Sequence, residues 1–453
     1  MLKELILENI GPAPAMELPF GKRINLLTGD NGLGKTFLLD IAWWALTQSW
    51  PAEVNRKLSS GMMAKPDDNS DARSGIKFSL SGKDELVEWD YYFDRKNQKW
   101  TGRYRLVEKD QQWSEGHLAP YPGLVIYAQA DGGLAIWDSQ RNLPDWRDLF
   151  FGNNNPHNRP PAFVFSPDEI WNGLQDSTGK RLCNGLIADW AGWQKEQGVT
   201  IRALENILTT LSPSQDELLR LGQLTRISLS DVRDIPTLRM PYGQEVPVLH
   251  ASSGIRRILS LCYLLVWAWQ EHSLACKLLG TPKATQLVFL IDEIEAHLHP
   301  KWQRSILRSL LEMAKLIGTW LPDAQVQFII ATHSPLILAS MEPFFDSTMD
   351  KWFDIDLLSF HDSPPRVQLT EQVFLRRGDA SNWLTSNAFD LKSGGLSLEA
   401  EQALEEASAL LNGGQVDIAQ VREVEQKLFS VLSDTDPFWI RWRYLLEKKG
   451  LQP

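Results

Sequence analysis

The sequence contains few cysteines and no apolar run long enough to cross a bilayer. Its longest strongly apolar run, Ile258 to Trp269, is shorter than the roughly 20 residues that a membrane helix needs. Charged residues interrupt the first ten positions, which therefore lack the pattern of a signal peptide. The three cysteines form neither a Cys-x-x-Cys pair nor an even set: Cys183, Cys262 and Cys276. These features favour a cytoplasmic protein with reduced thiols and no membrane contact.

The chain also lacks an excess of positive charge. Its formal net charge is −11, which argues against a surface that is basic throughout. Any contact with nucleic acid would therefore have to use a local basic patch. The 453 residues suggest two or three domains, or one domain with large insertions, and a hydrophobic fraction of 43% is ample for a core.

A phosphate-binding loop is present near the start of the chain. The segment Gly29 to Thr36 fits the pattern G-x-x-x-x-G-K-S/T and follows the apolar, strand-like segment Ile24 to Leu27. Glycines let successive backbone N–H groups point at phosphate oxygens, Lys35 supplies a charge for the β and γ phosphates, and the Thr36 hydroxyl can bind Mg²⁺. A Gly-rich turn that merely contains a lysine is the alternative, but the strand before it and the apolar helix after it argue against that. The segment predicts binding of a nucleoside triphosphate with Mg²⁺.

A second acidic motif lies about 250 residues downstream. The continuous apolar run Gln286 to Ile291 is typical of a strand buried on both faces, and Asp292 and Glu293 follow it directly. One carboxylate at such a strand end can hold Mg²⁺, and the next can polarise the attacking water. The pair is a weak signal alone and a strong one together with the phosphate-binding loop.

Two further segments extend this pattern. After a helix expected at Trp302 to Ile317 comes an apolar strand, Val326 to Ala331, which leads into Thr332-His333-Ser334-Pro335. Upstream, the small residues Ser252, Ser253 and Gly254 open a long apolar helix. Such a turn can bind an anion at a helix N-terminus, and we expect it to serve the nucleotide of a partner subunit.

This ordered set resembles the ABC-type ATPases of the SMC, RecF, Rad50 and OLD group, over residues 1–50 and 245–340. The resemblance implies an α/β P-loop NTPase fold with an ABC-type head, a mixed β-sheet flanked by helices, a helical insertion and a C-terminal helical module. It also implies that Asp292 is the Walker B magnesium carboxylate and Glu293 the general base. The implied Walker A contacts are Gly29, Asn31, Gly32, Gly34, Lys35 and Thr36.

The same resemblance assigns further loops. Residues 296–300 look like the D-loop, and His333 looks like the switch histidine near the γ phosphate. The family signature is LSGGQ or LSGGE, whereas this chain has Ala251 to Ile255, in which Ser252 and Gly254 keep the contacting positions and Ser253 replaces a glycine. Gln129, after a strand-like segment, is the candidate for the magnesium-sensing glutamine. The arrangement implies at least a homodimer that encloses two ATP molecules, and it leaves room for a higher oligomer built from dimers.

Several neighbouring residues have two interpretations. His297 and His299 lie two positions apart beside acidic residues, but no third ligand follows at metal spacing, which favours a D-loop or surface role over zinc. Arg256 and Arg257 either contact phosphate or form a solvated helix start.

The motifs divide the chain into expected parts. Residues 1–50 and 245–360 form the ATPase core, 51–180 a β-rich lobe that completes it, 181–244 a helical insertion with connecting strands, and 361–453 a C-terminal helical module. The insertion is too short for the long coiled coil of SMC or Rad50 proteins.

The C-terminal module bears apolar and basic residues. Its apolar side chains either dock a partner or complete the chain's own core: Phe438, Trp439, Trp442 and Leu446. Its basic end, with Arg441, Arg443, Lys448 and Lys449, is more typical of a solvated helix than of a nucleic-acid contact.

No nuclease motif is recognisable in the sequence. The short tail resembles the stand-alone ATPase subunits of anti-phage defence systems, such as PtuA of Septu and retron-associated pairs. That resemblance implies a sensor or regulatory ATPase that controls a separately encoded nuclease. The alternative is a RecF-like DNA-repair ATPase whose ATP-closed dimer clamps DNA, and a transporter subunit is a distant third.

Overall fold

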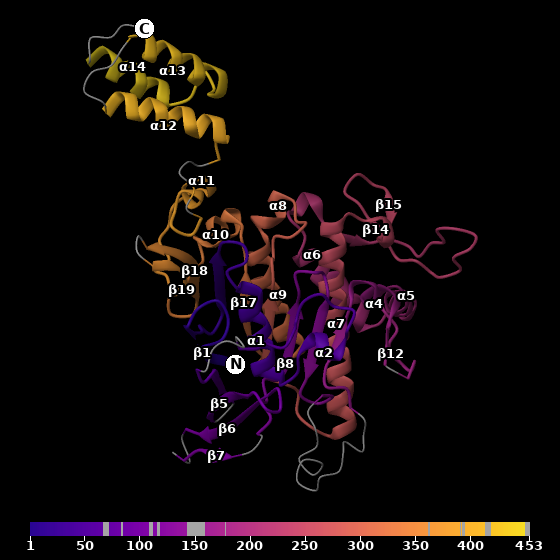
Figure 1. The fold of residues 1–453 in the computed structure, drawn as a ribbon. Coiled ribbons are helices and arrows are strands. Elements are labelled where there is room, and N and C mark those ends of the chain that lie inside the picture. Colours follow the sequence, from indigo (N-terminus) through magenta and orange to yellow (C-terminus); the bar gives the residue numbers. More distant parts are fainter. Residues whose placement is uncertain are drawn as a thin grey trace. The chain divides into compact units, whose positions relative to one another are not determined.

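The computed structural model of the chain describes residues 1–66, 72–82, 85–107, 112–115, 118–142, 159–176, 178–360, 363–389, 391, 395–412 and 418–448. These residues fall into two compact units, Met1–Arg376 and Arg377–Pro453, and we describe each by itself (Figure 1). No helix among them is long and apolar enough to cross a membrane.

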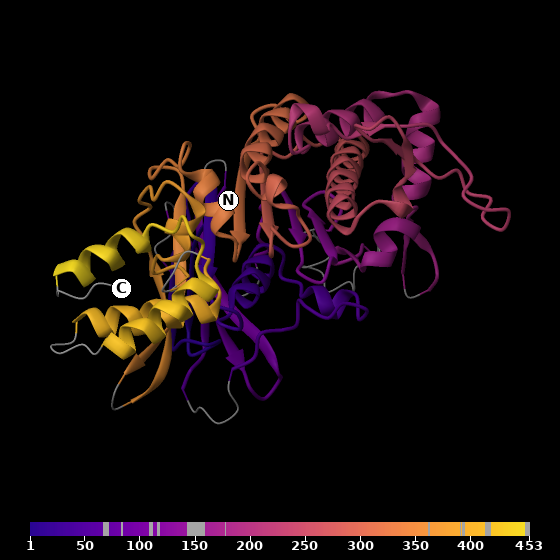
Figure 2. The ribbon, with the colours of Figure 1, turned by 90° about the horizontal axis from the view of Figure 1, so that it is seen from above.

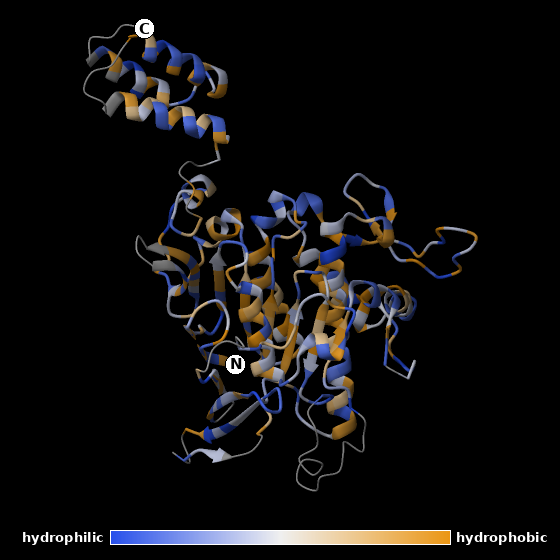
Figure 3. Cartoon of the chain, viewed as in Figure 1, coloured by the Kyte–Doolittle hydropathy of each residue, from blue (hydrophilic) through white to orange (hydrophobic). Residues whose placement is uncertain are grey.

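An eight-stranded mixed sheet forms the centre of the first unit. Its strand order is β10-β9-β8-β16-β17-β3-β18-β19, and the five strands from β8 to β18 run parallel. The bounds are β10 Phe163–Phe165, β9 Leu134–Asp138, β8 Leu124–Ala128, β16 Gln286–Ile291, β17 Gln325–Ala331, β3 Ile24–Gly29, β18 Lys351–Phe360 and β19 Ser363–Glu371. The central strands β3 and β16 are buried and mostly apolar, as strands covered on both faces require (Figure 3). The expected α/β fold with a mixed sheet flanked by helices is confirmed.

A second, antiparallel sheet lies in the same unit, in the order β2-β1-β4-β5-β6-β7. Its strands are β2 Ala15–Pro19, β1 Leu2–Glu8, β4 Gly75–Ser81, β5 Leu86–Asp94, β6 Lys99–Leu106 and β7 Ser114–Glu115. Helix α1 (Lys35–Thr47) packs in one hydrophobic core with side chains of both sheets. The centroid of the Trp44 ring lies 4.9 Å from that of Tyr91 and 5.5 Å from that of Trp50. Helix α1 is thus covered on several sides, which explains why it is apolar around most of its circumference.

Helices α4 to α7 contact one another and form a helical region of the first unit (Figure 2). The bounds are α4 Pro167–Asn172, α5 Leu186–Glu196, α6 Val199–Thr210 and α7 Ser253–Leu279. Three short strands lie between α6 and α7 in the sequence: β13 Arg220–Leu221, β14 Thr237–Arg239 and β15 Glu245–Pro247. Shorter elements are α2 Pro51–Val54, β11 Leu174–Gln175 and β12 Arg181–Cys183.

The helix expected at Trp302 to Ile317 is two helices in the structure. Helix α8 (Pro300–Gln303) ends before Ser305, and α9 begins at Ile306 and ends at Trp320. The Ser305 hydroxyl donates to the carbonyl oxygens of Lys301 and Trp302, and such side-chain bonds compete with helix continuation. Helix α10 (Pro335–Met341) follows β17.

The boundary expected at residue 361 differs from the one in the structure. Strands β18 and β19 form a hairpin that extends the central sheet, since β18 pairs with β3, and the two units divide at Arg376 and Arg377. Likewise, β1 from the first 50 residues pairs with β4 of the 51–180 region, while β8 to β10 from that region belong to the central sheet. These strands pair across long separations that the sequence pattern does not specify.

The second unit contains α11 (Ala380–Leu384), α12 (Leu398–Asn412), α13 (Ile418–Val431) and α14 (Phe438–Lys448). Trp439, Trp442 and Leu446 of α14 are buried in a core that they share with α12 and α13, and Phe438 packs partly against it. Of the two interpretations left open for these side chains, the chain's own core is therefore correct.

Candidate nucleotide-binding and hydrolysis site

The carboxyl ends of β3, β8, β16 and β17 lie along one edge of the central sheet, because these strands are parallel neighbours. In open α/β sheets, ligands bind at such an edge. The phosphate-binding loop follows β3, Gln129 follows β8, Asp292 follows β16 and Thr332 follows β17. The topology thus gathers four segments that are far apart in the sequence.

The glycines of the loop are required by their backbone positions. Gly29 has φ +127°, and a Cβ atom there would lie 2.2 Å from the carbonyl oxygen of Ile355 on β18. Gly34 has φ +105°, and a Cβ atom there would lie 2.8 Å from Cγ of Pro12. Any other residue at either position would be strained and would clash.

Lys35 lies within the loop rather than on the surface. Its ammonium group donates to the carbonyl oxygens of Gly29 and Asp30, each at 2.7 Å, and the residue is 5% exposed. Burial lowers the pKa of the ammonium to about 8, although the carboxylates of Asp292 and Asp30 act in the opposite direction. Among the described residues, no carboxylate hydrogen-bonds to this ammonium, and a buried cation of this kind suits an anionic ligand such as phosphate.

Thr36 and Asp292 meet directly although they are far apart in the sequence. The Thr36 hydroxyl donates to Oδ2 of Asp292 at 2.7 Å, and Asp292 is 1% exposed. Burial raises the pKa of the Asp292 carboxyl, while the bond from Thr36 lowers it. A hydroxyl and a carboxylate in contact are oxygen donors of the kind that Mg²⁺ binds.

Gln129 follows β8, the strand that pairs with β16. Its Nε2 donates to the Ser60 hydroxyl at 3.1 Å, whereas its Oε1 is buried and has no hydrogen-bond partner among the described residues. A buried acceptor without a donor is costly unless a ligand or a water completes it. The residues present therefore fit a magnesium site, and the assignment of Gln129 to it stays a prediction.

Glu293, the expected general base, has an unusual backbone. Its φ is +47°, in the left-handed region that residues other than glycine rarely adopt. Its carbonyl oxygen accepts a hydrogen bond from Nη2 of Arg257 at 3.2 Å, and that of Asp292 accepts from the same nitrogen at 2.6 Å. Such conformations persist where the surroundings hold them, and they are frequent at active sites.

Glu295 is a residue that the sequence analysis missed. Its carboxylate accepts from the Thr332 hydroxyl at 2.7 Å and from the backbone N–H of His333 at 2.5 Å. It therefore fastens the turn after β16 to the turn after β17. The only signal in the sequence is a third acidic residue two positions after Glu293, which is common on exposed turns.

His333 is half-buried near Lys35, Glu293 and Glu295. Burial and the nearby Lys35 ammonium lower its pKa, while Glu295 and Glu293 act in the opposite direction. A neutral imidazole at pH 7 can donate one hydrogen bond without adding charge.

The serine-rich turn begins α7. Ser252 is the N-cap residue, its hydroxyl oxygen accepts from the N–H of Ile255 at 3.4 Å, and both Ser252 and Ser253 are exposed. A Cβ atom at Gly254 would lie 2.4 Å from the carbonyl oxygen of His297, so this glycine lets α7 approach the chain's own 296–300 turn. Ser252 is thus open to solvent in the single chain, while Gly254 is already in contact.

The two histidines and two arginines with open interpretations are now placed. His299 accepts at Nδ1 from the N–H of Lys301 and so caps α8. His297 has φ +63° and lines a pocket. The Arg256 guanidinium lies 4.9 Å from the centre of the Trp171 ring, whereas Arg257 bonds to the turn after β16. In the described part of the chain, no three His, Cys, Asp or Glu side chains gather as a metal site.

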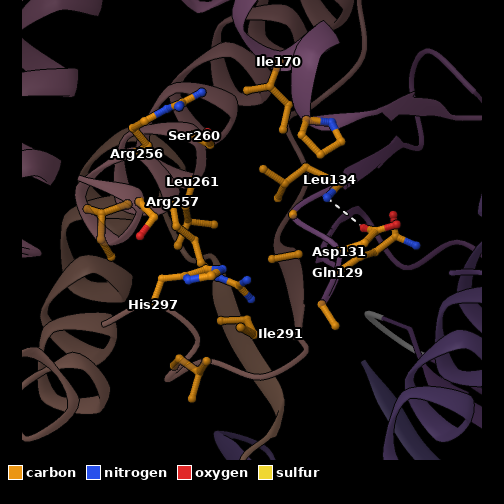
Figure 4. Close-up of a pocket in the computed structure, with 18 of the residues that line it drawn as sticks. Gln129, Asp131, Leu134, Ile170, Arg256, Arg257, Ser260, Leu261, Ile291 and His297 are labelled. Carbon is orange, nitrogen blue, oxygen red and sulfur yellow. Dashed lines mark hydrogen bonds between the residues drawn. The ribbon is translucent and has the colours of Figure 1, made fainter. Parts of the chain in front are cut away.

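An open pocket of about 200 Å³ lies between the turn after β8, α4, the first turns of α7 and the turn after β16 (Figure 4). Residues that line it include Gln129, Asp131, Ile170, Arg257, Leu261 and His297. Gln129 and Ser253 both line it, so the pocket lies between the turn after β8 and the serine-rich turn.

Comparison with known proteins identifies the family. Residues 24–339, more than half of the chain, match the ATPase family described as "AAA domain, putative AbiEii toxin, Type IV TA system". The chain belongs to this AAA family. The AAA domain therefore includes the phosphate-binding loop, the acidic motif, the serine-rich turn and His333.

Relatives of this AAA protein include the Septu protein PtuA of Bacillus thuringiensis, 25% identical over 74% of this chain and 72% of PtuA. The "Retron Vc95 probable ATPase" of Vibrio cholerae serotype O1 biovar El Tor is 30% identical over 25% of this chain. The matched part spans about a fifth (21%) of that protein. The SMC head domain from Thermotoga maritima is 13% identical, with a TM-score of 0.40, over 82% of this chain and 99% of that one. The expected likeness to PtuA and the retron ATPases is confirmed.

Proposed function

We propose that this AAA protein hydrolyses Mg²⁺–ATP in a two-site homodimer and thereby controls a separately encoded nuclease in an anti-phage defence complex. The hydrolytic part depends on one observation above all. Residues 256 positions apart, Thr36 and Asp292, form a direct 2.7 Å hydrogen bond at the end of the strands, beside the buried Lys35. That is the arrangement through which P-loop ATPases bind the metal and the phosphates.

Each residue then has a role that follows from its position. Backbone N–H groups of the loop and Lys35 would bind the β and γ phosphates, and Thr36, Asp292 and Gln129 would hold the metal. When bound, Mg²⁺ neutralises charge on the phosphate oxygens. Glu293 accepts the proton of the attacking water, and neutral His333 donates a hydrogen bond toward the γ phosphate.

The exposed serine-rich turn supports the homodimer. Ser252 begins a helix of 27 residues, whose N-terminus favours anions, and its hydroxyl is accessible on the single chain. In a head-to-tail pair, each chain would place this turn over the nucleotide bound by the other.

The regulatory role is supported by the relationship to PtuA, which extends over 74% of this chain. The RecF-like alternative receives less support. Several basic side chains on the antiparallel sheet are paired with acids, as in Lys77–Glu8 at 2.7 Å and Arg103–Asp90 at 2.9 Å. Paired charges contribute little to binding of a polyanion.

The test is co-expression of this protein with the nuclease encoded by a neighbouring gene, followed by phage plating and in-vitro DNA cleavage. We expect co-purification, and we expect protection to be lost with Lys35→Ala or with an inactivated nuclease. Robust DNA cleavage by the purified chain alone, or tight ATP-dependent DNA binding without any partner, would overturn the regulatory role.

A further inference from the structure

Arg257 connects two parts of the site that the proposed mechanism uses separately. It belongs to the second turn of α7, five residues after Ser252. Its Nη2 donates to the carbonyl oxygen of Asp292 at 2.6 Å and to that of Glu293 at 3.2 Å. Figure 4 shows Arg257 extending from α7 toward Ile291 at the end of β16, whereas Arg256 points away from that strand.

The backbone of the acidic turn has hydrogen bonds besides those from Arg257. The N–H of Asp292 donates to the carbonyl of Ala128, that of Ile294 to the carbonyl of Ala331, and that of Ala296 to the carbonyl of Glu293 at 2.8 Å. Glu293 itself has a left-handed φ of +47°. The arginine therefore contacts the one segment whose conformation aims the Glu293 carboxylate.

A second contact links the same helix to the same turn. Gly254 lies so close to the carbonyl of His297 that a Cβ atom there would be 2.4 Å away. The first turns of α7 thus touch the 292–298 segment at two points, one on each side of Glu295. A shift of α7 cannot leave this segment unmoved, because both contacts are already close.

We propose that Arg257 is a positioning residue. When the nucleotide bound by a second copy contacts the Ser252 turn, Arg257 transmits this contact to the Glu293 carboxylate of its own chain. This inference rests on the proposed two-site homodimer. Each chain's Ser252 turn would cap the ATP bound by its partner, while its Glu293 acts on the ATP that the chain itself binds. Arg257 would then make hydrolysis at one site depend on occupancy of the other.

The surroundings of Arg257 agree with a role in holding the backbone of the acidic turn rather than in binding phosphate. Arg257 is half-buried, and burial lowers the pKa of its guanidinium, while Asp292 and Glu293 act in the opposite direction. Its hydrogen bonds to the acidic turn go to carbonyl oxygens of the backbone, and the position of the backbone sets the direction of the side chains. A displacement of about 1 Å at a catalytic group can cost about 100-fold in rate.

The test compares Arg257→Met with Arg141→Met. Arg141 is the control, because it too donates to a backbone carbonyl, that of Glu271 on α7 at 3.1 Å, far from the acidic turn, and it also pairs with the Glu271 carboxylate. We measure ATP affinity by fluorescent-nucleotide titration, ATP-dependent dimerisation by light scattering, and turnover against ATP concentration.

We expect Arg257→Met to bind ATP and dimerise within about twofold of wild type but to lose about 10- to 100-fold in kcat, with a Hill coefficient reduced to 1. Arg141→Met should keep wild-type kcat and cooperativity. Arg257→Lys keeps a hydrogen-bond donor and the positive charge, and it should give an intermediate kcat. This variant provides the test if Arg257→Met does not fold.

Wild-type kcat and cooperativity in Arg257→Met, or in Arg257→Lys if only that variant folds, would overturn the inference. So would equal losses in Arg257→Met and Arg141→Met, since these would indicate general support of α7. A wild-type protein that neither hydrolyses ATP nor dimerises would instead contradict the proposed function itself.

Discussion

Two adjacent carboxylates at the end of β16 have different surroundings, and this difference separates their expected roles. Asp292 is 1% exposed and accepts a hydrogen bond from Thr36, whereas the backbone of Glu293 has a left-handed conformation. Such a division suits a metal ligand beside a general base.

Glu293→Gln should therefore bind ATP normally but hydrolyse it about 10²- to 10⁴-fold more slowly, because the amide cannot accept the proton of water. Single-turnover hydrolysis and nucleotide titration measure the two effects separately. Lys35→Ala is the complementary variant and should lose ATP binding. Equal turnover in wild type and Glu293→Gln would remove Glu293 from this role.

A buried carboxyl behind the site makes stability depend on pH. Burial raises the pKa of Asp40 to about 7, although the hydrogen bond that Asp40 accepts from the Tyr127 hydroxyl at 2.8 Å lowers this pKa. Between about pH 4, the usual range for aspartate, and pH 7, the folded chain holds a proton that the unfolded chain releases. Stability from this group therefore falls as pH rises through that window.

Asp40→Asn removes the titration and keeps an acceptor for Tyr127. From pH 5 to pH 8, the variant should gain about 2–3 kcal/mol in free energy of unfolding relative to wild type. Urea denaturation at the two pH values measures this difference. Parallel pH dependences for the two proteins would contradict the assignment.

At the scale of elements, the contact between α7 and the 296–300 turn requires a glycine. Gly254→Ala should destabilise the protein by about 1–3 kcal/mol, because the added methyl group meets the His297 carbonyl. Gly192→Ala, in α5, is the control, since nothing lies within 4 Å of the added atom. That change should be neutral or stabilising by up to about 1 kcal/mol. Thermal unfolding of both variants gives the comparison, and equal stabilities would show that the contact is not tight.

The second unit has its own core, so its removal at the unit boundary should be tolerated. Deletion of residues 377–453 should leave ATP hydrolysis within about twofold of the full chain, because the sheet and site belong to Met1–Arg376. A shorter deletion, 434–453, removes Trp442 and Leu446 from the core of the second unit and should unfold that unit. Circular dichroism and ATPase assays on both truncations test this, and an insoluble 1–376 chain would contradict it.

At the scale of the whole molecule, the proposed homodimer predicts complementation between defective chains. Lys35→Ala chains cannot bind ATP, and Ser252→Arg chains cannot cap the nucleotide of a partner. A mixed dimer contains one composite site with both an intact Lys35 and an intact Ser252. ATP-dependent dimers with one bound ATP should therefore reappear on mixing, while neither variant alone forms such a dimer. Light scattering and nucleotide titration measure this, and hydrolysis in the mixed dimer should stay low, because its second site is empty. Absence of ATP-dependent dimers in the mixture would argue against shared sites.

The sequence by itself determined the features that contiguous residues build. The loop from Gly29 to Thr36 is one backbone turn between a strand and a helix, so its pattern carries its geometry. The apolar runs before Asp292 and Thr332 were recognisable as buried strands for the same local reason. Membership of an ATPase family followed from these motifs in order.

Only the tertiary structure decided which of these segments meet. The 2.7 Å bond from Thr36 to Asp292, the contacts of Arg257 with the acidic turn and those of Glu295 with the end of β17 depend on the strand order β8-β16-β17-β3. The same holds for α14, whose apolar side chains suit a partner surface or a core equally well from periodicity alone. Periodicity specifies that a face is buried, but the element that covers it is set by long-range pairing, which no local pattern encodes.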